Sequence, residues 1–270
     1  MNWAFLTVAS GMFNALWTSL IKDKVRGTGA MPFSASIRLG VGLVLFPYAL
    51  TLWHAYSLKW WVMTLSAGLS ETASVWTLSR GSRDDYYSTF ALSNTTPLFS
   101  ALAATYFLGE AMTPALALGV LCVVAGAFWL YRAGHWSWWG LWTSLLSALC
   151  GLFSKSVIAE SGFAPHACFA FLSGGAAMAL AGRAAGRMGL DELARNLARN
   201  RLLIGISTLA TICFFSALAL APLNRVSPLV RVNMVAGFLL SVYMLGERER
   251  LVSRALGALV IMAGLVLVVF

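Results

Sequence analysis

The sequence Tyr-Phe-Leu-Gly-Glu at residues 106–110 recurs as Tyr-Met-Leu-Gly-Glu at residues 243–247. The stretch after each copy carries a matching pair of glycines, Gly119 and Gly126 in the first and Gly257 and Gly264 in the second. Upstream, Ala-Leu-Trp-Thr at residues 15–18 matches Gly-Leu-Phe-Ser at residues 151–154. Because the matches recur in the same order, the chain is predicted to consist of two related halves.

Both halves are strongly apolar. Of 270 residues, 59% are hydrophobic and 11% are charged, and the mean hydropathy is +0.78, whereas about 25% of the residues of a soluble domain are charged. The apolar stretches are roughly 20 residues long, which is the length that crosses the hydrocarbon core of a bilayer. We predict ten transmembrane helices, at residues 3–21, 31–54, 58–79, 86–108, 113–131, 137–158, 164–182, 202–221, 226–246 and 252–270.

The number of helices in each half fixes how the halves relate to the membrane. The first repeat, residues 1–132, and the second, residues 137–270, each contain five predicted helices. An odd number of crossings inverts the second half relative to the first. The expected fold is therefore an all-α membrane protein with ten transmembrane helices in two inverted five-helix repeats, an architecture that places a substrate site near the membrane midplane.

One connection is long enough to form structure of its own. The segment from Arg183 to Arg201 carries five arginines, and its leucines recur at helical spacing. This pattern predicts an interfacial basic helix near residues 186–200 in contact with membrane lipids. The alternative is a solvated basic loop.

The basic residues are distributed unevenly between the two sides. Fourteen Lys and Arg residues fall in the odd-numbered connections, and the even-numbered ones hold only Lys59 and Arg225. The positive-inside rule then places the odd-numbered connections in the cytoplasm and both termini outside it. This bias accounts for the net charge of +9 without nucleic acid as a partner. The expected location is the bacterial cytoplasmic (inner) membrane, as a multi-pass protein.

Charged residues inside the predicted helices are candidates for function, because an uncompensated charge there is costly. They are Arg38, Glu71, Lys155 and Arg231. Glu71 lies midway along its helix, where a protonatable acid suits proton coupling, or it forms a structural pair with Arg38. Lys155 lies close to a helix end, where it either contributes to the site or extends its side chain to the membrane surface.

The repeat also brings polar residues into register. Arg231 occupies the position equivalent to Asn94, and Asn233 that equivalent to Thr96. A guanidinium at this depth could hold a carboxylate or a phosphate in bidentate geometry. Three further candidates for the substrate path are Asn14, Trp17 and Trp76.

Other kinds of chemistry find little support in the sequence. The four cysteines are irregularly spaced within apolar runs, and the three histidines are far apart. We therefore expect no metal site, no cofactor and no catalytic set, so the chain is not predicted to be an enzyme.

These motifs resemble the drug/metabolite transporter superfamily, in its ten-helix EamA-like branch. The resemblance rests on Asn-Thr-Thr-Pro-Leu-Phe at 94–99, Leu-Gly-Glu at 108–110, the segment from Gly119 to Gly126, the second copy from Ser227 to Glu247, and Arg38. It covers essentially the whole chain and implies alternating-access transport of small metabolites, often export. It implies no substrate, and the first helix lacks the acid that the small multidrug branch carries.

The sequence thus predicts a secondary active or facilitative transporter that acts through a central polar cavity, most naturally as an exporter. Three cations against one carboxylate favour an anionic or zwitterionic small-molecule substrate, such as an amino acid-like compound, with protons as the candidate coupling ion. The alternative function is a lipid-carrier flippase or a membrane assembly or binding protein. The monomer and the homodimer are both compatible with the sequence.

Overall fold

The computed structural model describes residues 2–26, 29–131, 136–245 and 251–270, and within these ranges the secondary structure is helical. In the first half the helices are α1 (Trp3–Arg26), α2 (Ala30–Thr51), α3 (Leu58–Asp84), α4 (Tyr86–Ser93), α5 (Thr96–Leu108) and α6 (Pro114–Tyr131). In the second half they are α7 (Trp138–Ser161), α8 (Phe163–Ala184), α9 (Leu190–Arg199), α10 (Arg201–Leu220), α11 (Leu223–Leu229), α12 (Val232–Leu245) and α13 (Leu251–Val269).

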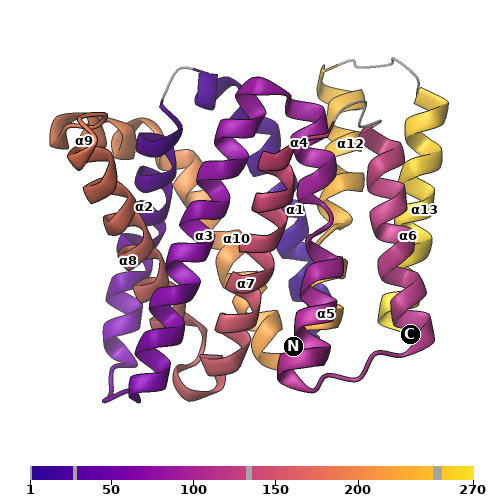
Figure 1. Cartoon of the computed structure of the whole chain (residues 1–270), viewed down its shortest axis with the longest axis horizontal. Coiled ribbons are helices and arrows are strands. Elements are labelled where there is room, and N and C mark those ends of the chain that lie inside the picture. The colour runs from indigo at the N-terminus through magenta and orange to yellow at the C-terminus, as the bar shows by residue number, and fades with distance from the viewer. Residues whose placement is uncertain (1, 27–28, 132–135, 246–250) are drawn as a thin grey trace.

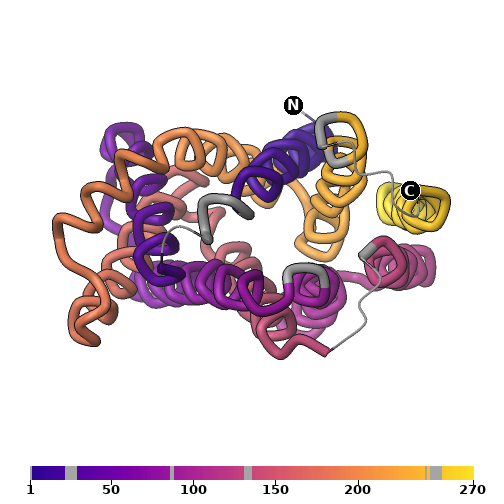
Figure 2. Tube along the Cα trace, turned by 90° about the horizontal axis from the view of Figure 1, so that it is seen from above, coloured from indigo at the N-terminus to yellow at the C-terminus, as the bar shows by residue number. Residues whose placement is uncertain are grey.

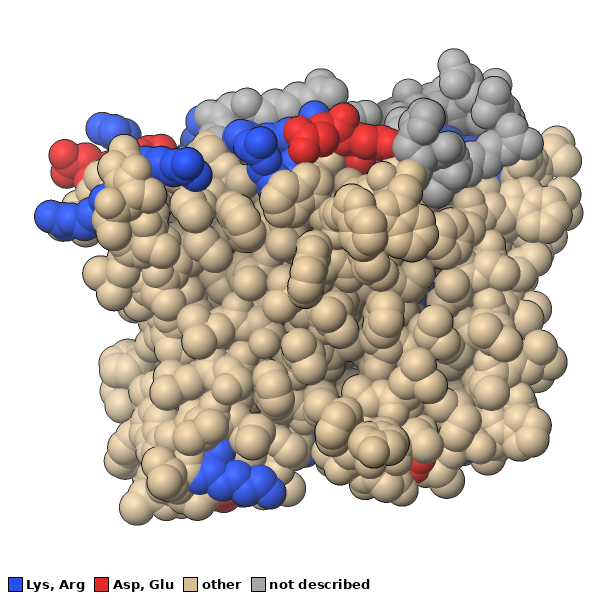
Figure 3. Space-filling view, in the orientation of Figure 1, with Lys and Arg blue, Asp and Glu red and all other residues tan. Residues whose placement is uncertain are grey.

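Length and composition identify the surroundings of these helices. Among the described residues, α1, α2, α7, α8, α10 and α13 each contain a stretch long and apolar enough to cross a membrane. The face of the molecule shown in Figure 3 has a broad uncharged band at mid-height, and most of its charged side chains lie along one edge. Uncharged side chains in this band suit contact with lipid, where polar groups are costly. The fold defines an all-α membrane protein.

The two edges of the molecule differ in what they carry. In Figure 1 the upper edge holds α9 and the corner between α3 and α4, and we call it the basic face. The lower edge holds both chain ends, the connection between α2 and α3, and the corner between α10 and α11, and we call it the terminal face. Consecutive long helices run between the two faces.

Two of the predicted helices are interrupted. The helix expected at 86–108 is divided into α4 and α5 at Asn94 and Thr95, and the helix expected at 226–246 is divided into α11 and α12 at Val230 and Arg231. At the first break, Pro97 cannot donate to the carbonyl of Ser93, so that carbonyl accepts hydroxyl groups instead. At the second break, short-range bonds replace the regular pattern, for example from the Arg231 amide to the Pro228 carbonyl at 2.9 Å.

The helices enclose a central region. Viewed from above, α1, α10 and α12 form one long side and α3, α4, α5 and α7 the other (Figure 2). One end is formed by α2, α8 and α9, and the other by α6 and α13. The main contacts join α1 to α10, α3 to α7, α2 to α8, and α6 to α13.

Glycines allow the closest of these contacts. A Cβ on Gly119 would lie 2.8 Å from the carbonyl oxygen of Gly264, and a Cβ on Gly126 would lie 2.8 Å from that of Gly257. The repeated glycine pairs therefore face each other across the α6–α13 contact, where the lack of side chains lets the two backbones pack closely. The α3–α8 contact is tighter still, because a Cβ on Gly68 would overlap the carbonyl oxygen of Ala170.

The basic connection between α8 and α10 contains the predicted helix. α9 covers residues 190–199, and its side chains separate by polarity around the axis. Leu197 packs against the main core, whereas Leu190 is exposed on the surface. The expected helix near 186–200 is present but shorter, because Gly186 adopts a left-handed conformation that turns the chain after α8.

Candidate functional site: a polar cavity between the two long sides

A cavity of about 300 Å³ lies within the ring of helices. Polar groups enter it from α1, α2, α3, α7, α10 and from both interrupted helices. Toward the basic face its lining reaches Ser19, which is exposed, and Arg254. Toward the terminal face it ends at Leu223, the first residue of α11. The lining therefore runs from the buried α10–α11 corner, where Leu223 is 1% exposed, toward the basic face.

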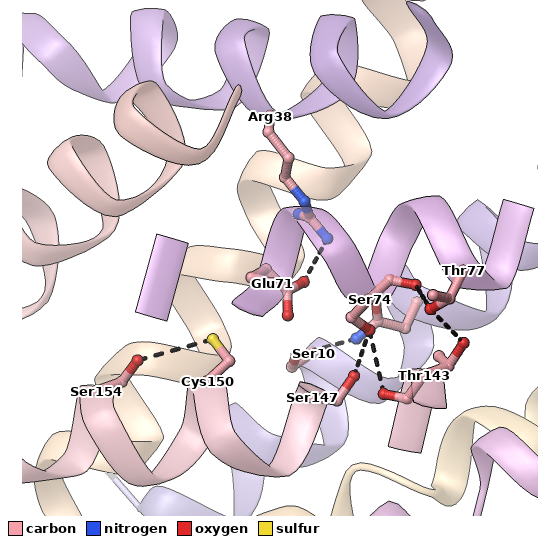
Figure 4. A network of polar contacts seen from close by, with 10 residues as sticks. Ser10, Arg38, Glu71, Ser74, Thr77, Thr143, Ser147, Cys150 and Ser154 are labelled. Atoms are coloured by element: carbon pink, nitrogen blue, oxygen red, sulfur yellow. Dashed lines mark hydrogen bonds and ion pairs between the residues drawn. The ribbon is translucent and has the colours of Figure 1, made fainter. Parts of the chain in front are cut away.

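One wall carries the ion pair that the sequence suggested. Arg38 on α2 donates from Nη2 to Oε1 of Glu71 on α3, and the two side chains point toward each other in Figure 4. The Arg38 side chain is only 8% exposed, and that of Glu71 is 22% exposed. The guanidinium also lies over the ring of Phe171, 4.9 Å from its centroid, an arrangement that favours a cation. Arg38 is thus held by charge and by packing.

Beside the pair, hydroxyl groups connect α3 to α7. Ser74 Oγ lies 2.6 Å from Ser147 Oγ, and Thr77 Oγ1 lies 2.8 Å from Thr143 Oγ1. The four residues form the chain of contacts in Figure 4. Residues four or three apart on a helix share one face, so each helix presents a short polar stripe. These stripes make the wall next to Glu71 hydrophilic without adding charge.

The opposite part of the cavity is built from the two helix breaks. Arg231 Nη1 donates to Asn94 Oδ1 at 3.0 Å, so the hydrogen bond joins the break before α12 to the break after α4. Asn94 also donates from Nδ2 to the carbonyl of Phe90 at 2.7 Å, which fixes its orientation. Asn233 follows in the first turn of α12 and lines the same cavity. The interrupted backbone thus carries polar side chains to the interior.

Some polar atoms in the lining have no hydrogen-bond partner within the described residues. They are the indole Nε1 of Trp17, the Nε of Arg38 and the Oδ1 of Asn233. A buried unsatisfied polar group costs about 1–3 kcal/mol. A ligand that offers both hydrogen-bond acceptors and hydrogen-bond donors can satisfy these three atoms.

Most of the residues singled out in the sequence meet in this cavity. Those in the lining are Asn14, Trp17, Arg38, Glu71, Asn94, Arg231 and Asn233. Trp76 is not among them, because it packs edge-on against Trp139 at 5.8 Å. Lys155 is not among them either. Its Nζ donates to the carbonyls of Leu218 and Ala221 at 2.7 and 2.9 Å, at the end of α10.

The sequence reading missed an important part of the wall. Ser74, Thr143, Ser147, Phe171, Phe214, Phe215, Phe238 and Arg254 line the cavity, and none of them was predicted from the sequence. Arg254 lies over the Phe238 ring at 5.2 Å. The hydroxyl pairs had a detectable signal, since their spacing of three or four residues interrupts otherwise apolar helices. The aromatic residues gave no detectable signal in the sequence, because a phenylalanine can equally well face lipid.

Comparisons with known proteins bear on the fold alone. No family model and no curated protein matches the sequence. A solved structure described as "Crystal structure of protein" has a TM-score of 0.75 at 15% sequence identity, over 99% of this chain and 98% of that one. The likeness spans nearly the full length of both chains, so another protein adopts this arrangement of helices.

Proposed function

We propose that this protein is a secondary transporter of a small anionic or zwitterionic metabolite, built from ten membrane crossings in two inverted five-helix repeats. In this proposal α4 with α5, and α11 with α12, each make one crossing. The cavity binds the substrate, and rearrangement of the helices exposes it to one face and then to the other. Export is the expected direction.

The observation that carries the proposal is the pair of helix breaks joined by the Arg231–Asn94 hydrogen bond. Non-helical backbone at membrane depth is tolerated where it lines a polar cavity, and discontinuous helices typically form transporter substrate sites. Both breaks here contribute to the lining of one cavity through Asn94, Val230 and Arg231. A purely structural membrane protein gains nothing from interrupting two helices at the same place.

The internal symmetry supports the inverted repeats. α4 ends at Ser93 and α11 ends at Leu229, positions 136 residues apart, and the sequence motifs recur at nearly that spacing. The helix contacts also come in equivalent pairs: α3 packs on α7 as α10 packs on α1, and α5 packs on α7 as α12 packs on α1. Two further contacts, α2 with α8 and α6 with α13, join equivalent helices directly, and α3 packs on α8 as α10 packs on α2, although the α3–α8 contact is the more extensive of these two.

The charges in the wall support the class of substrate. The described lining contains three guanidinium groups, those of Arg38, Arg231 and Arg254, and one carboxylate, that of Glu71. An excess of guanidinium groups favours a carboxylate or phosphate, while the aromatic side chains offer contact with an apolar part. Glu71 supplies a place for a proton or for the ammonium group of a zwitterion.

The distribution of charge supports the orientation. The basic face carries α9 and the end of α3 with Arg80 and Arg83, and both chain ends lie on the opposite face (Figure 1). By the positive-inside rule the basic face lies in the cytoplasm. The cavity then extends toward the cytoplasm, the side from which an exporter collects its substrate.

A thermal-stability screen of the purified protein against amino acids, other carboxylates, phosphorylated metabolites and a polyprenyl phosphate tests the proposal. A ligand that binds the folded state raises the apparent melting temperature. We expect stabilisation by a carboxylate or zwitterion that is lost in Arg231→Ala, followed by uptake of that compound into proteoliposomes. Stabilisation by the polyprenyl phosphate alone would instead indicate a lipid-carrier flippase, and a stabilising metabolite that is not transported would contradict the proposal.

A further inference from the structure

Two oppositely charged side chains bind the corner between α10 and α11, at the end of the cavity toward the terminal face. Glu110 belongs to the repeated Gly-Glu motif, and Lys155 lies on α7. We infer that these two residues form a clamp that keeps the cavity closed on the terminal face, so that their release is required for it to open there. The inference rests on the proposed transport function and assigns roles to residues outside the substrate cavity.

The acidic half of the clamp holds the beginning of α11. Both carboxylate oxygens of Glu110 accept backbone N–H groups, from Leu223 at 2.8 Å and from Asn224 at 2.9 Å. Asn224 in turn donates from Nδ2 to the carbonyl of Ala111 at 3.0 Å. Three hydrogen bonds therefore tie the chain just after α5 to the first turn of α11, and two of them are strengthened by the negative charge.

The repeated motif explains how Glu110 reaches this position. Gly109 ends α5 in the left-handed conformation, with φ +67°, where a side chain would be strained. The Glu110 amide then bonds back to the Ala104 carbonyl at 3.2 Å, which completes the end of the helix. The glycine turns the chain so that the next carboxylate leaves the α5 axis and meets α11.

The basic half of the clamp holds the end of α10. Lys155 donates to the carbonyls of Leu218 and Ala221, which are among the last of that helix. Carbonyls at a helix C-terminus carry partial negative charge and amides at a helix N-terminus carry partial positive charge. At the corner between α10 and α11, the lysine thus binds carbonyls at the C-terminus of α10, and the carboxylate binds amides at the N-terminus of α11.

The position of this corner connects it to the cavity. Leu223, whose amide Glu110 binds, also lines the cavity, and Gly151 beside it belongs to α7, the helix that carries Lys155. A Cβ on Gly151 would lie 3.0 Å from Leu223 Cδ1, so the corner is seated directly against α7. Opening the cavity to the terminal face requires α11 to move away from α5 or α7. Either movement breaks charge-assisted hydrogen bonds.

The test uses a cysteine at Ser227, a lining residue on α11, in protein without its four native cysteines. A membrane-impermeant thiol reagent is applied to sealed vesicles from the terminal face and, separately, from the basic face. Glu110→Gln keeps the size of the side chain but loses the charge and one acceptor. We expect it to raise the labelling rate from the terminal face by roughly tenfold, the value of one charge-assisted hydrogen bond.

The matched control is Glu160→Gln. Glu160 lies on the same face and also binds backbone, accepting the Ser57 amide at 2.7 Å, but it is exposed and outside the cavity lining. We expect no change in labelling for this variant. Lys155→Met provides a second, independent release of the corner and should act in the same direction as Glu110→Gln.

The outcomes separate the clamp from the transport function, because labelling needs no substrate. Faster terminal-face labelling in Glu110→Gln and in Lys155→Met, with Glu160→Gln unchanged, supports the clamp. Equal rates in all three variants would overturn it, even if a substrate were found. If Glu110→Gln fails to fold, Lys155→Met decides the question alone. If both variants fail to fold, Glu110→Asp takes their place. This substitution keeps the charge but shortens the side chain by one methylene, and it should also raise the labelling rate from the terminal face.

Discussion

Replacing Glu71 by glutamine perturbs the centre of the cavity while keeping its shape. The wild-type carboxylate balances the charge of Arg38, whose side chain is 8% exposed and lies over Phe171. The guanidinium of an arginine is a permanent cation in proteins. The substitution Glu71→Gln therefore leaves a buried cation without its counter-charge.

The expected cost follows from how the pair is placed. Removing one partner of a fully buried pair costs about 3–5 kcal/mol. Here the Glu71 side chain is 22% exposed, and an amide oxygen can still accept one hydrogen bond from Arg38. Glu71→Gln should therefore lower the free energy of unfolding by the value of one charge-assisted hydrogen bond, about 2 kcal/mol. In the double variant Arg38→Gln/Glu71→Gln no charge is left unbalanced, so the combined loss should be smaller than the sum of the single losses by about 1 kcal/mol or more.

Unfolding in detergent, measured for the wild type, both single variants and the double variant, provides the comparison. Asp191→Asn serves as control, because Asp191 is exposed on α9 and should change the free energy of unfolding by about 0.5 kcal/mol or less. Additive losses in the double variant would show that the two charges do not depend on each other. A Glu71→Gln protein as stable as the control would refute the reasoning entirely.

The same variant tests proton coupling once a substrate is identified. If Glu71 carries the proton, Glu71→Gln imitates the protonated form, and transport should lose its dependence on pH. Transport that retains a normal pH dependence would exclude Glu71 as the proton carrier and leave it a structural partner of Arg38.

Three further predictions follow from the fold and the cavity. Arg231→Lys keeps the charge but loses the planar donor pair, so affinity for an identified anionic ligand should fall roughly tenfold; unchanged binding by calorimetry would remove Arg231 from the site. A reporter active only in the cytoplasm, fused after Phe270, should stay silent, and strong signal from it would reverse the proposed orientation. Gly174→Ala should destabilise the protein by about 1–3 kcal/mol, because its Cβ would lie 2.1 Å from the Gly68 carbonyl oxygen, whereas the control Gly205→Ala meets nothing within 4 Å; equal melting temperatures would contradict the close α3–α8 contact.

Composition and periodicity were sufficient for the class of fold. An apolar stretch of about 20 residues must satisfy its backbone within itself in a membrane, so a helix is the expected outcome wherever such a stretch occurs. The glycine pairs at 119 and 126 and at 257 and 264 were likewise predictable as packing positions, because their spacing places each pair on one helix face. They now face each other across α6 and α13.

The sequence also indicated most of the charged residues in the lining, for a simple energetic reason. Arg38, Glu71 and Arg231 are too costly to face lipid, so the interior was the expected place for them, and all three line the cavity. Lys155 obeyed the same rule in a different way. Its Nζ donates to two backbone carbonyls at the end of α10, and no sequence pattern predicts which helix end lies within reach of this side chain.

Only the tertiary structure decided where the helices break and which residues meet. A proline identifies a weak point, but whether a helix continues depends on neighbours that bond to the released backbone groups, as the Ser144 hydroxyl does when it donates to the Ser93 carbonyl. The Arg231–Asn94 bond joins residues 137 positions apart, and its formation depends on the rotation of two helices that local sequence leaves free. One residue of helical phase turns a side chain by about 100°, which is the difference between the cavity and the lipid.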